Sequence, residues 1–280
     1  MSLARILVGG FCACAVSLGL GRFAYTPILP LMGIDTESAG WLAASNNLGY
    51  LIGAVWASWA STERQRHRLL DFGLALVALS LAVMATTRDH TAWTLIRLAA
   101  GIGSALVFVL GSALVVPRLV RMGRAKLSGL HFGGVGLGIV LSGSAIAATG
   151  AWAGDAGAWW AAGGICAVLS AISFLCLRHP SQPPGGPAPA PAKPVPFPLP
   201  LLAASYLCAG FGYIITGTFL VVVVRATPGL TPWANGAWVV VGLAAIPSAA
   251  AWGWIAEHKG HAPALGAAHL LMAAGTALLG

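Results

Sequence analysis

Charged side chains are scarce in this sequence. Of its 280 residues, only 8% are Asp, Glu, Lys or Arg, whereas 58% are apolar. An ordinary soluble domain carries roughly a quarter of charged residues, so water cannot be the solvent for most of this surface. The composition excludes an ordinary soluble domain and indicates a chain that is surrounded mainly by the lipid bilayer.

Acidic residues are the rarest charged type, with 7 Asp and Glu against 15 Lys and Arg, and the net charge is +8. A basic balance could indicate nucleic-acid binding, but that function needs positive residues clustered on one exposed face or arm. The Lys and Arg of this chain are not clustered in that way. We therefore expect no nucleic-acid partner.

The sequence also lacks motifs for binding a metal or a cofactor. The five cysteines have no ligand-like spacing and are interpreted as small apolar packing residues. The segment GVGLG lacks the flanking strand and soluble helix of a dinucleotide-binding loop. Because no nucleophile, paired acids, metal cluster or ATP-binding motif is present, we predict no enzyme activity and no cofactor. The histidines in loops or at span ends, which suggest no metal site, are His67, His90, His179, His258 and His261.

Long apolar runs recur along the whole chain. About 20 apolar residues cross a ~30 Å hydrocarbon core as a helix, and uniform apolarity argues against barrel strands. The first run is too long for a signal core and meets Arg22 instead of a cleavage site. We predict an all-α, polytopic transmembrane bundle. Its nine expected spans are 4–31, 38–60, 69–87, 91–117, 127–149, 157–177, 199–224, 234–256 and 262–280.

The positive residues of the short loops fall mainly on one side of these spans. One side carries 11 Lys and Arg, among them Arg64, Arg66 and Arg68, whereas the other side carries only Arg88 and Arg225. Positive residues favour the cytoplasmic side. We therefore expect a multi-pass protein of a bacterial inner membrane with a cytoplasmic amino terminus.

A Pro-rich stretch, SQPPGGPAPAPAKPVPFPLP, separates six spans from the rest. Such a stretch cannot be helical and should be an extended connector, although an ordinary loop is the alternative. We predict a six-helix bundle at 1–177, a cytoplasmic linker at 178–198 and a partial bundle of three helices at 199–280.

A weak internal repeat crosses that linker. The spacing from Gly19-Leu-Gly21 to Ile28-Leu29 equals the spacing from Gly210-Phe-Gly212 to Phe219-Leu220, and Trp41 matches Trp238. Duplicated halves with a substrate path between them are common in secondary transporters. Because the sequence ends inside an apolar run, a full repeat would need three further spans.

The segments GLGRFAYTPILPLM (19–32) and GWLAASNNLGYLIGA (40–54) resemble the opening of the YbfB/YjiJ-type branch of the major facilitator superfamily (MFS). The resemblance continues through RLAAGIGSALVFV and GGVGLGIVLSG and covers essentially the whole chain. It implies an MFS-like permease built from two six-helix bundles, truncated here at about nine of twelve helices.

The resemblance also implies roles for single residues. Arg97, Gly101 and Gly103 resemble a pattern linked to proton coupling, although Ala100 replaces its Gln. Gly134 and Gly138 resemble an antiporter pattern, with Ile139 where Pro is expected. The segment 253–261 resembles the superfamily's gating loop, with Glu for Asp and His for both Arg. The residues carried over to that loop are Gly253, Glu257, Lys259 and Gly260.

Arg22 and Arg97 are the two arginines expected inside spans. An intramembrane charge costs ~2.5 to 3.5 kcal/mol or more, so such residues should face the bundle interior or a wet cavity. Arg22 lies about 24 Å up its helix and Arg97 about 9 Å from the outer end of an antiparallel helix, which places both at similar depth. For Arg97 the alternative is a side chain that reaches the outer headgroups.

No acid lies deep in any predicted span. Two buried guanidinium groups without carboxylates need carbonyls, tyrosines, water or a bound anion. We therefore expect a small solute that carries an anionic group, held by Arg22 and Arg97 in forked hydrogen bonds. Other polar residues could line the solute path or only bond neighbouring helices; they are Tyr25, Thr26, Asn46, Tyr50, Tyr213 and Thr216.

Two functions of different classes remain open from the sequence. The first is a secondary carrier that moves a small solute by alternating access, with protons as the expected coupling ion. The second is a truncated membrane protein that inserts into the bilayer without transport, or that acts only as an interaction partner. Neither reading requires a metal or a bound cofactor.

Overall fold

The computed structural model describes residues 2–178 and 199–278, and the fold is helical throughout these ranges. The predicted linker therefore lies outside the described residues, except for Arg178. The principal helices are α1 (Leu3–Cys14), the π-helix η1 (Ala15–Arg22), α2 (Tyr25–Met32), α3 (Thr36–Ser58), α4 (Glu63–Met84), α5 (His90–Arg121), α6 (Ser128–Leu177), α7 (Leu199–Ala226), α8 (Ala234–Lys259) and α9 (His261–Ala277).

Two short 3₁₀ turns, η2 (Ala125–Leu127) and η3 (Thr231–Trp233), lead into α6 and α8. Seven helical segments in the described ranges are long and apolar enough to cross a membrane. These seven confirm seven of the nine predicted spans by length and composition. Helix α3 is long enough but carries too many Ser, Asn and Gly residues, and α9 is described over only 17 residues.

The first span consists of α1, η1 and α2 and is 30 residues long. Its middle is a π-helix that contains Gly19 and Gly21. A Cβ on Gly19 would lie 2.7 Å from the Cα of Gly138, so the two backbones pack directly against each other. A π-helical segment within an α-helix often marks a functional site, because it re-aims the residues that follow. Here it ends at Arg22.

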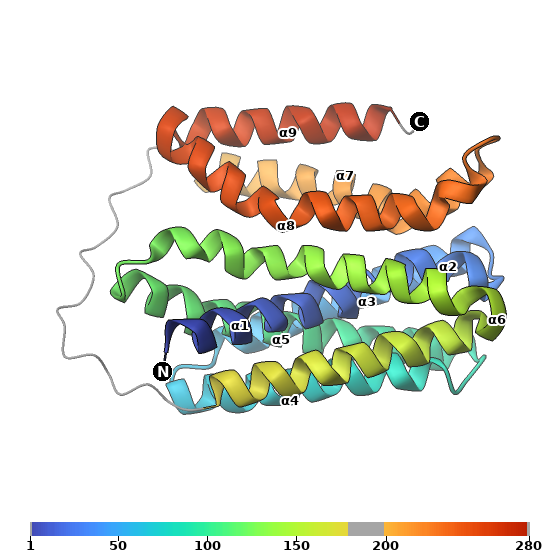
Figure 1. The fold of residues 1–280 in the computed structure, drawn as a ribbon, viewed down its shortest axis with the longest axis horizontal. Helices are drawn as coiled ribbons and strands as arrows, with labels where there is room; N and C mark the ends of the chain where they lie inside the picture. The colour runs from blue at the N-terminus through green and yellow to red at the C-terminus, as the bar shows by residue number, and fades with distance from the viewer. Residues whose placement is uncertain (1, 179–198, 279–280) are drawn as a thin grey trace.

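Helix α6 contains both the fifth and the sixth predicted spans. The chain reverses at Gly154, whose φ of 63° and ψ of −160° are non-helical, and the two arms are Ala125–Gly150 and Trp152–Leu177. A positive φ of this kind suits glycine because glycine has no Cβ to clash. Figure 1 shows the two arms running in opposite directions from this turn.

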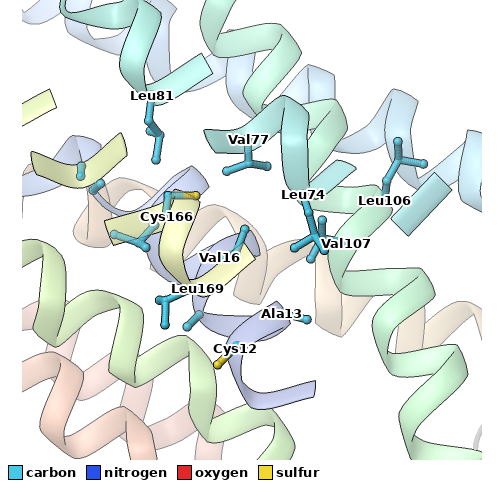
Figure 2. Close-up of a cluster of buried hydrophobic side chains, with 14 of the residues drawn as sticks. Cys12, Ala13, Val16, Leu74, Val77, Leu81, Leu106, Val107, Cys166 and Leu169 are labelled. Atoms are coloured by element: carbon cyan, nitrogen blue, oxygen red, sulfur yellow. The ribbon is translucent and has the colours of Figure 1, made fainter. Parts of the chain in front are cut away.

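Small residues on α3 allow it to lie close against α5; they form a stripe of Ser45, Gly49, Gly53 and Ala57. A Cβ on Gly53 would lie 2.5 Å from the carbonyl oxygen of Ile102, so only glycine fits there. Close backbone approach of this kind drives helix association in membranes, where lipid is as apolar as leucine. Interior packing continues between α1, α4, α5 and the second arm of α6. The labelled core residues in Figure 2 are Cys12, Ala13, Val16, Leu74, Val77, Leu81, Leu106, Val107, Cys166 and Leu169.

Helices α7, α8 and α9 lie together on one side of the bundle in Figure 1. The first arm of α6 packs along α8, and a small cluster joins Ile139 of α6 to Val221 and Trp238. Trp238 is only 2% exposed, whereas Trp41, its counterpart in the internal repeat, is 66% exposed. The repeat therefore does not place these two tryptophans in equivalent surroundings, and the predicted division into two bundles stays a prediction.

Candidate functional site

Arg22 lies half-buried at the seam between the first six spans and α7. Its guanidinium carbon is 5.6 Å from the ring centre of Phe23, 5.9 Å from that of Tyr50 and 5.4 Å from that of Tyr213. These distances are within cation–π range. The three rings come from the first span, α3 and α7, so residues of both predicted halves surround one positive charge.

Arg97 projects from α5 toward the end of the π-helix. Its Nη1 donates to the carbonyl of Gly21 at 3.2 Å and its Nη2 donates to the carbonyl of Arg22 at 3.4 Å. The ring of Tyr25 covers the guanidinium at 4.8 Å. Because Arg97 is only 2% exposed, the side chain is buried against the π-helix instead of extending to the headgroups.

The surroundings of Arg97 are fixed by two polar side chains of the predicted site. Asn46 on α3 donates from Nδ2 to the backbone carbonyl of Arg97 at 2.9 Å, and the Tyr25 hydroxyl donates to the carbonyl of Ala39 at 3.0 Å. Both side chains are buried. The Nε atom of Arg97 has no hydrogen-bond partner within the described residues. Arg97 thus holds the backbone at Gly21 and Arg22, and its Nε–H donor is left without a partner among the described residues.

Thr26 and Thr216 occupy different environments. Thr26 donates from Oγ1 to the carbonyl of Gly217 at 2.6 Å and so links α2 to α7. Thr216 bonds the carbonyl of Gly212 within its own helix and approaches Thr276 of α9 at 3.4 Å. Thr216 therefore faces α9 in this structure and does not line the pocket beside Arg22, whereas Tyr213, one helical turn away, reaches Arg22.

A narrow pocket lies between the two arginines and α7. It offers about 10 Å³, which is roughly the space that one water molecule needs. Five of its ten lining residues were not predicted from the sequence, and two of these five, Ile214 and Thr218, lie on α7. The residues added by the structure are Phe23, Ala43, Asn47, Ile214 and Thr218, and those already expected are Arg22, Tyr25, Thr26, Asn46 and Arg97.

The predicted gating segment lies at the end of α8, where the helix meets the start of α6. Glu257 accepts an ion pair from Lys126 at 3.2 Å, which joins the seventh-to-ninth spans to the first six. A pocket of about 270 Å³ lies beside this pair, with Gly253 and Trp254 in its lining. Lys259 is the exposed last residue of α8, and Gly260 links α8 to α9 with a φ of 91°.

The glycines of α6 face two neighbours. Gly136 packs against α8, where a Cβ would lie 2.5 Å from the nitrogen of Ile246, and a Cβ on Gly129 would lie 2.6 Å from the Cα of Ala250. Gly134 and Gly138 face the other way, against Phe11 and Ala15 of the first span. The glycine-rich composition of α6 therefore serves close packing on both sides at once.

Charges outside the spans hold the ends of helices. Asp35 precedes α3, and the hydrogen bond that it accepts from the Ser38 amide lowers the pKa of this exposed carboxyl below its ordinary value. At the same end of the bundle, Arg88 pairs with Asp155 of α6, and the bond to that carboxylate raises the pKa of Arg88. No carboxylate contacts Arg22 or Arg97 in the described ranges.

A polytopic helical bundle with a polar pocket between two groups of helices has the layout of a membrane transporter. The profile of the family described as "Uncharacterised MFS-type transporter YbfB" matches residues 14–279. The chain therefore belongs to this family. The family predicted from the segments at 19–32 and 40–54 is confirmed.

Two related proteins add to this result. The sequence is 30% identical over 94 residues to the "Uncharacterized MFS-type transporter YceJ" of Bacillus subtilis (strain 168), and the match covers 32% of this chain and 24% of that protein. The fold is similar to that of the nucleoside transporter NupG (D323A mutant), with a TM-score of 0.61 at 13% identity. That similarity covers 92% of this chain and 68% of NupG, and it supports the predicted MFS-like bundle.

Proposed function

We propose that this protein is a secondary transporter that carries a small organic anion by alternating access, with Arg22 as the anion-binding residue. The observation that carries the proposal is the state of Arg22. Its half-buried guanidinium has aromatic rings around it but neither a hydrogen bond nor an ion pair within the described residues. A solute carboxylate or phosphate would complete its coordination.

Physical chemistry favours an anion at this position. A guanidinium presents five N–H donors in a fixed fork that matches two carboxylate or phosphate oxygens. Taking such a charge out of water is costly unless it is paired, and a second positive group, Arg97, lies bonded to the carbonyl of Arg22 itself. Two like charges at one level of the bundle attract a negative solute.

The seam between the groups of helices supports the rocking part of the proposal. Thr26 bonds α7, Lys126 pairs with Glu257 of α8, and the glycines of α6 allow α8 to lie against it along its length. At each end of the seam the contact is a polar one, and between the ends α6 and α8 pack closely through glycines. Such a seam can open at one end while it closes at the other, which is the geometry of alternating access.

Proton coupling and the membrane location are part of the same proposal. The likeness of Arg97, Gly101 and Gly103 to the coupling pattern supports protons as the coupling ion. The excess of Lys and Arg in one set of loops supports a bacterial inner membrane and a cytoplasmic amino terminus.

Transport by the full protein in proteoliposomes tests the proposal. Uptake of a panel of labelled small carboxylates and organic phosphates is measured with and without an imposed proton gradient. We expect at least one anion to be carried, and Arg22→Gln to reduce its uptake by about 100-fold, as for loss of a charge-assisted hydrogen-bonded pair. Arg22→Lys should restore only part of the uptake, because lysine lacks the planar fork.

Arg64→Gln is the matched control, because Arg64 is an exposed arginine at the start of α4. It removes the same charge far from the pocket and should leave uptake within about twofold, since exposed charges act weakly. Anion uptake that is unchanged in Arg22→Gln would overturn the assignment of Arg22. A neutral or cationic solute as the transported species would overturn the proposed substrate class.

A further inference from the structure

His131 forms a buried polar cluster away from the Arg22 pocket. It lies one turn into α6, is 0% exposed and faces α1 and α5. Its Nε2 atom is 3.2 Å from Oγ of Ser112 on α5 and 3.5 Å from Sγ of Cys14 on α1. Three helices thus place one hydrogen-bonding side chain each at a single point inside the first group of spans.

The two partners of His131 suit either protonation state of the ring. A hydroxyl and a thiol can each donate or accept a hydrogen bond. Ser112 can donate to Nε2 when the imidazole is neutral, and both Ser112 and Cys14 can accept when the ring is an imidazolium.

The helices that pack around His131 present no fixed charge to it in the described ranges. From α1 the titratable group that faces the ring is Cys14, and from α5 the polar group is Ser112. The buried arginine in the last turn of α5, Arg118, is paired with Glu63 of α4. A charged imidazolium therefore has no counter-ion in this arrangement and needs water, because an unpaired charge in an apolar interior is costly.

The helix that carries His131 contacts both groups of spans. One side of α6 lies against the first span through Gly134, where a Cβ would be 3.0 Å from Cβ of Cys14, and the other side lies against α8 through Gly136. Phe132, the next residue, lines the pocket that contains Lys126 and Glu257. A change of charge at His131 therefore acts on the helix that forms the seam.

We propose that His131 is the proton-binding residue of this transporter. Its ring takes one proton from water at the unprotonated nitrogen when the cluster of His131, Cys14 and Ser112 is open, and returns that proton to water before the cluster closes. Protonation favours the open arrangement because water solvates the imidazolium better than the neutral Ser112 and Cys14 side chains do. This inference rests on the proposed transport function and assigns its coupling site.

Alkylation of Cys14 tests the proposal, because this thiol is buried in the structure and contacts His131. A variant retains Cys14 and the exposed Cys208, with Cys12, Cys166 and Cys176 changed to Ala. The labelling rate of Cys14 by N-ethylmaleimide is divided by that of Cys208, which cancels the general effect of pH on thiols. We expect the ratio to rise about fourfold from about pH 8 to about pH 6, the range in which histidine gains its proton.

His131→Gln should give the same ratio at both pH values, whereas His269→Gln, a histidine change on α9, should keep the rise. An equal ratio at both pH values in the parent variant overturns the proposal, as does a rise that persists in His131→Gln. If His131→Gln does not fold, ¹⁵N NMR of the imidazoles in the parent variant decides: no signal among buried histidines that titrates in this range overturns it. Neither measurement involves a transported solute, so a failure here is separate from a failure of the anion proposal.

Discussion

Thr26 donates a 2.6 Å hydrogen bond from Oγ1 to the backbone carbonyl of Gly217, 191 residues away in the chain. The bond joins α2 to α7, the two helices that the internal repeat relates through Ile28-Leu29 and Phe219-Leu220. It lies beside the pocket that contains Arg22 and Thr218. The polar pocket and the contact between the two groups of spans therefore share one residue.

Replacing Thr26 by Val should remove this bond while keeping the shape of the side chain. Interhelical hydrogen bonds in membranes contribute about 0.6 to 2 kcal/mol, so we expect the free energy of unfolding to fall by about 1 kcal/mol. Unfolding in mixed micelles measures the change. Thr227→Val is the control, because the hydroxyl of Thr227, just after the end of α7, bonds only the carbonyl of Val223 in the last turn of that helix. Equal effects of the two changes would contradict a link between the spans.

Gly136→Ala should separate α6 from α8. The added Cβ would lie 2.5 Å from the Ile246 nitrogen and 2.6 Å from the Gly242 oxygen, which are backbone atoms that cannot rotate away. Overpacking of this kind costs about 1 to 3 kcal/mol, and we expect transport to fall about tenfold or more. Proteoliposome uptake and thermal unfolding measure the two effects.

Gly164→Ala is the matched control for this change, since no atom lies within 4 Å of a Cβ built there. It should leave both transport and unfolding unchanged. If Gly136→Ala behaves in the same way as Gly164→Ala, the close approach of α6 and α8 does not matter for transport.

The ion pair between Lys126 and Glu257 should affect how often the adjacent pocket between α6 and α8 opens more than it affects the free energy of unfolding. The two side chains are 81% and 49% exposed, and such surface pairs contribute at most about 1 kcal/mol. We expect Lys126→Glu to speed alkylation of a cysteine placed at Ala250, which lines the adjacent pocket, by about threefold. The double change Lys126→Glu with Glu257→Lys should restore the slower rate.

Ionic strength provides the second test of this pair. Salt at about 1 M shortens the range of charge interactions to about 3 Å, so the difference between Lys126→Glu and the parent should largely vanish. A difference that persists at high salt would indicate a packing effect of the substitution.

The carboxyl of Asp35 should titrate below the ordinary range of aspartate, because the Ser38 amide donates a hydrogen bond to its charged form. A pKa that is lower in the folded state stabilises the fold at pH values above the unfolded-state pKa, and this contribution is lost as the pH falls through the folded-state pKa. Side-chain ¹³C NMR measures the titration. Ser38→Ala removes the second bond, from the hydroxyl, and should raise the midpoint; an unchanged midpoint would contradict that bond.

Several features of the site could be predicted from residue type and depth alone. Arg22 and Arg97 were placed at similar depth by counting along antiparallel helices, and Arg97 indeed bonds the carbonyl of Arg22. The charge of these residues makes them costly in lipid, so an inward orientation follows from the sequence. Asn46 and Tyr50 were left between helix packing and the solute path, and the structure places Asn46 against α5 and Tyr50 beside Arg22.

Other features depended on the rotation of helices about their axes. Thr216 and Tyr213 were both predicted to line the solute path or to bond neighbouring helices, but Thr216 faces α9 while Tyr213 faces Arg22. His131 was not singled out at all. A histidine near the start of a span has no periodic signal, and only the meeting of α1, α5 and α6 gives it Cys14 and Ser112 as neighbours.

The sequence by itself determined that lipid surrounds most of this protein, and it determined where along the chain the helices lie. Transfer of a ~20-residue apolar helix into lipid depends mainly on that segment's own composition, so each span can be identified without its neighbours. The tertiary structure decided which face of each helix meets which partner, as with Gly134 against α1 and Gly136 against α8. In lipid an apolar face gains little by leaving its solvent, so close packing and polar contacts between spans far apart in the chain select the arrangement.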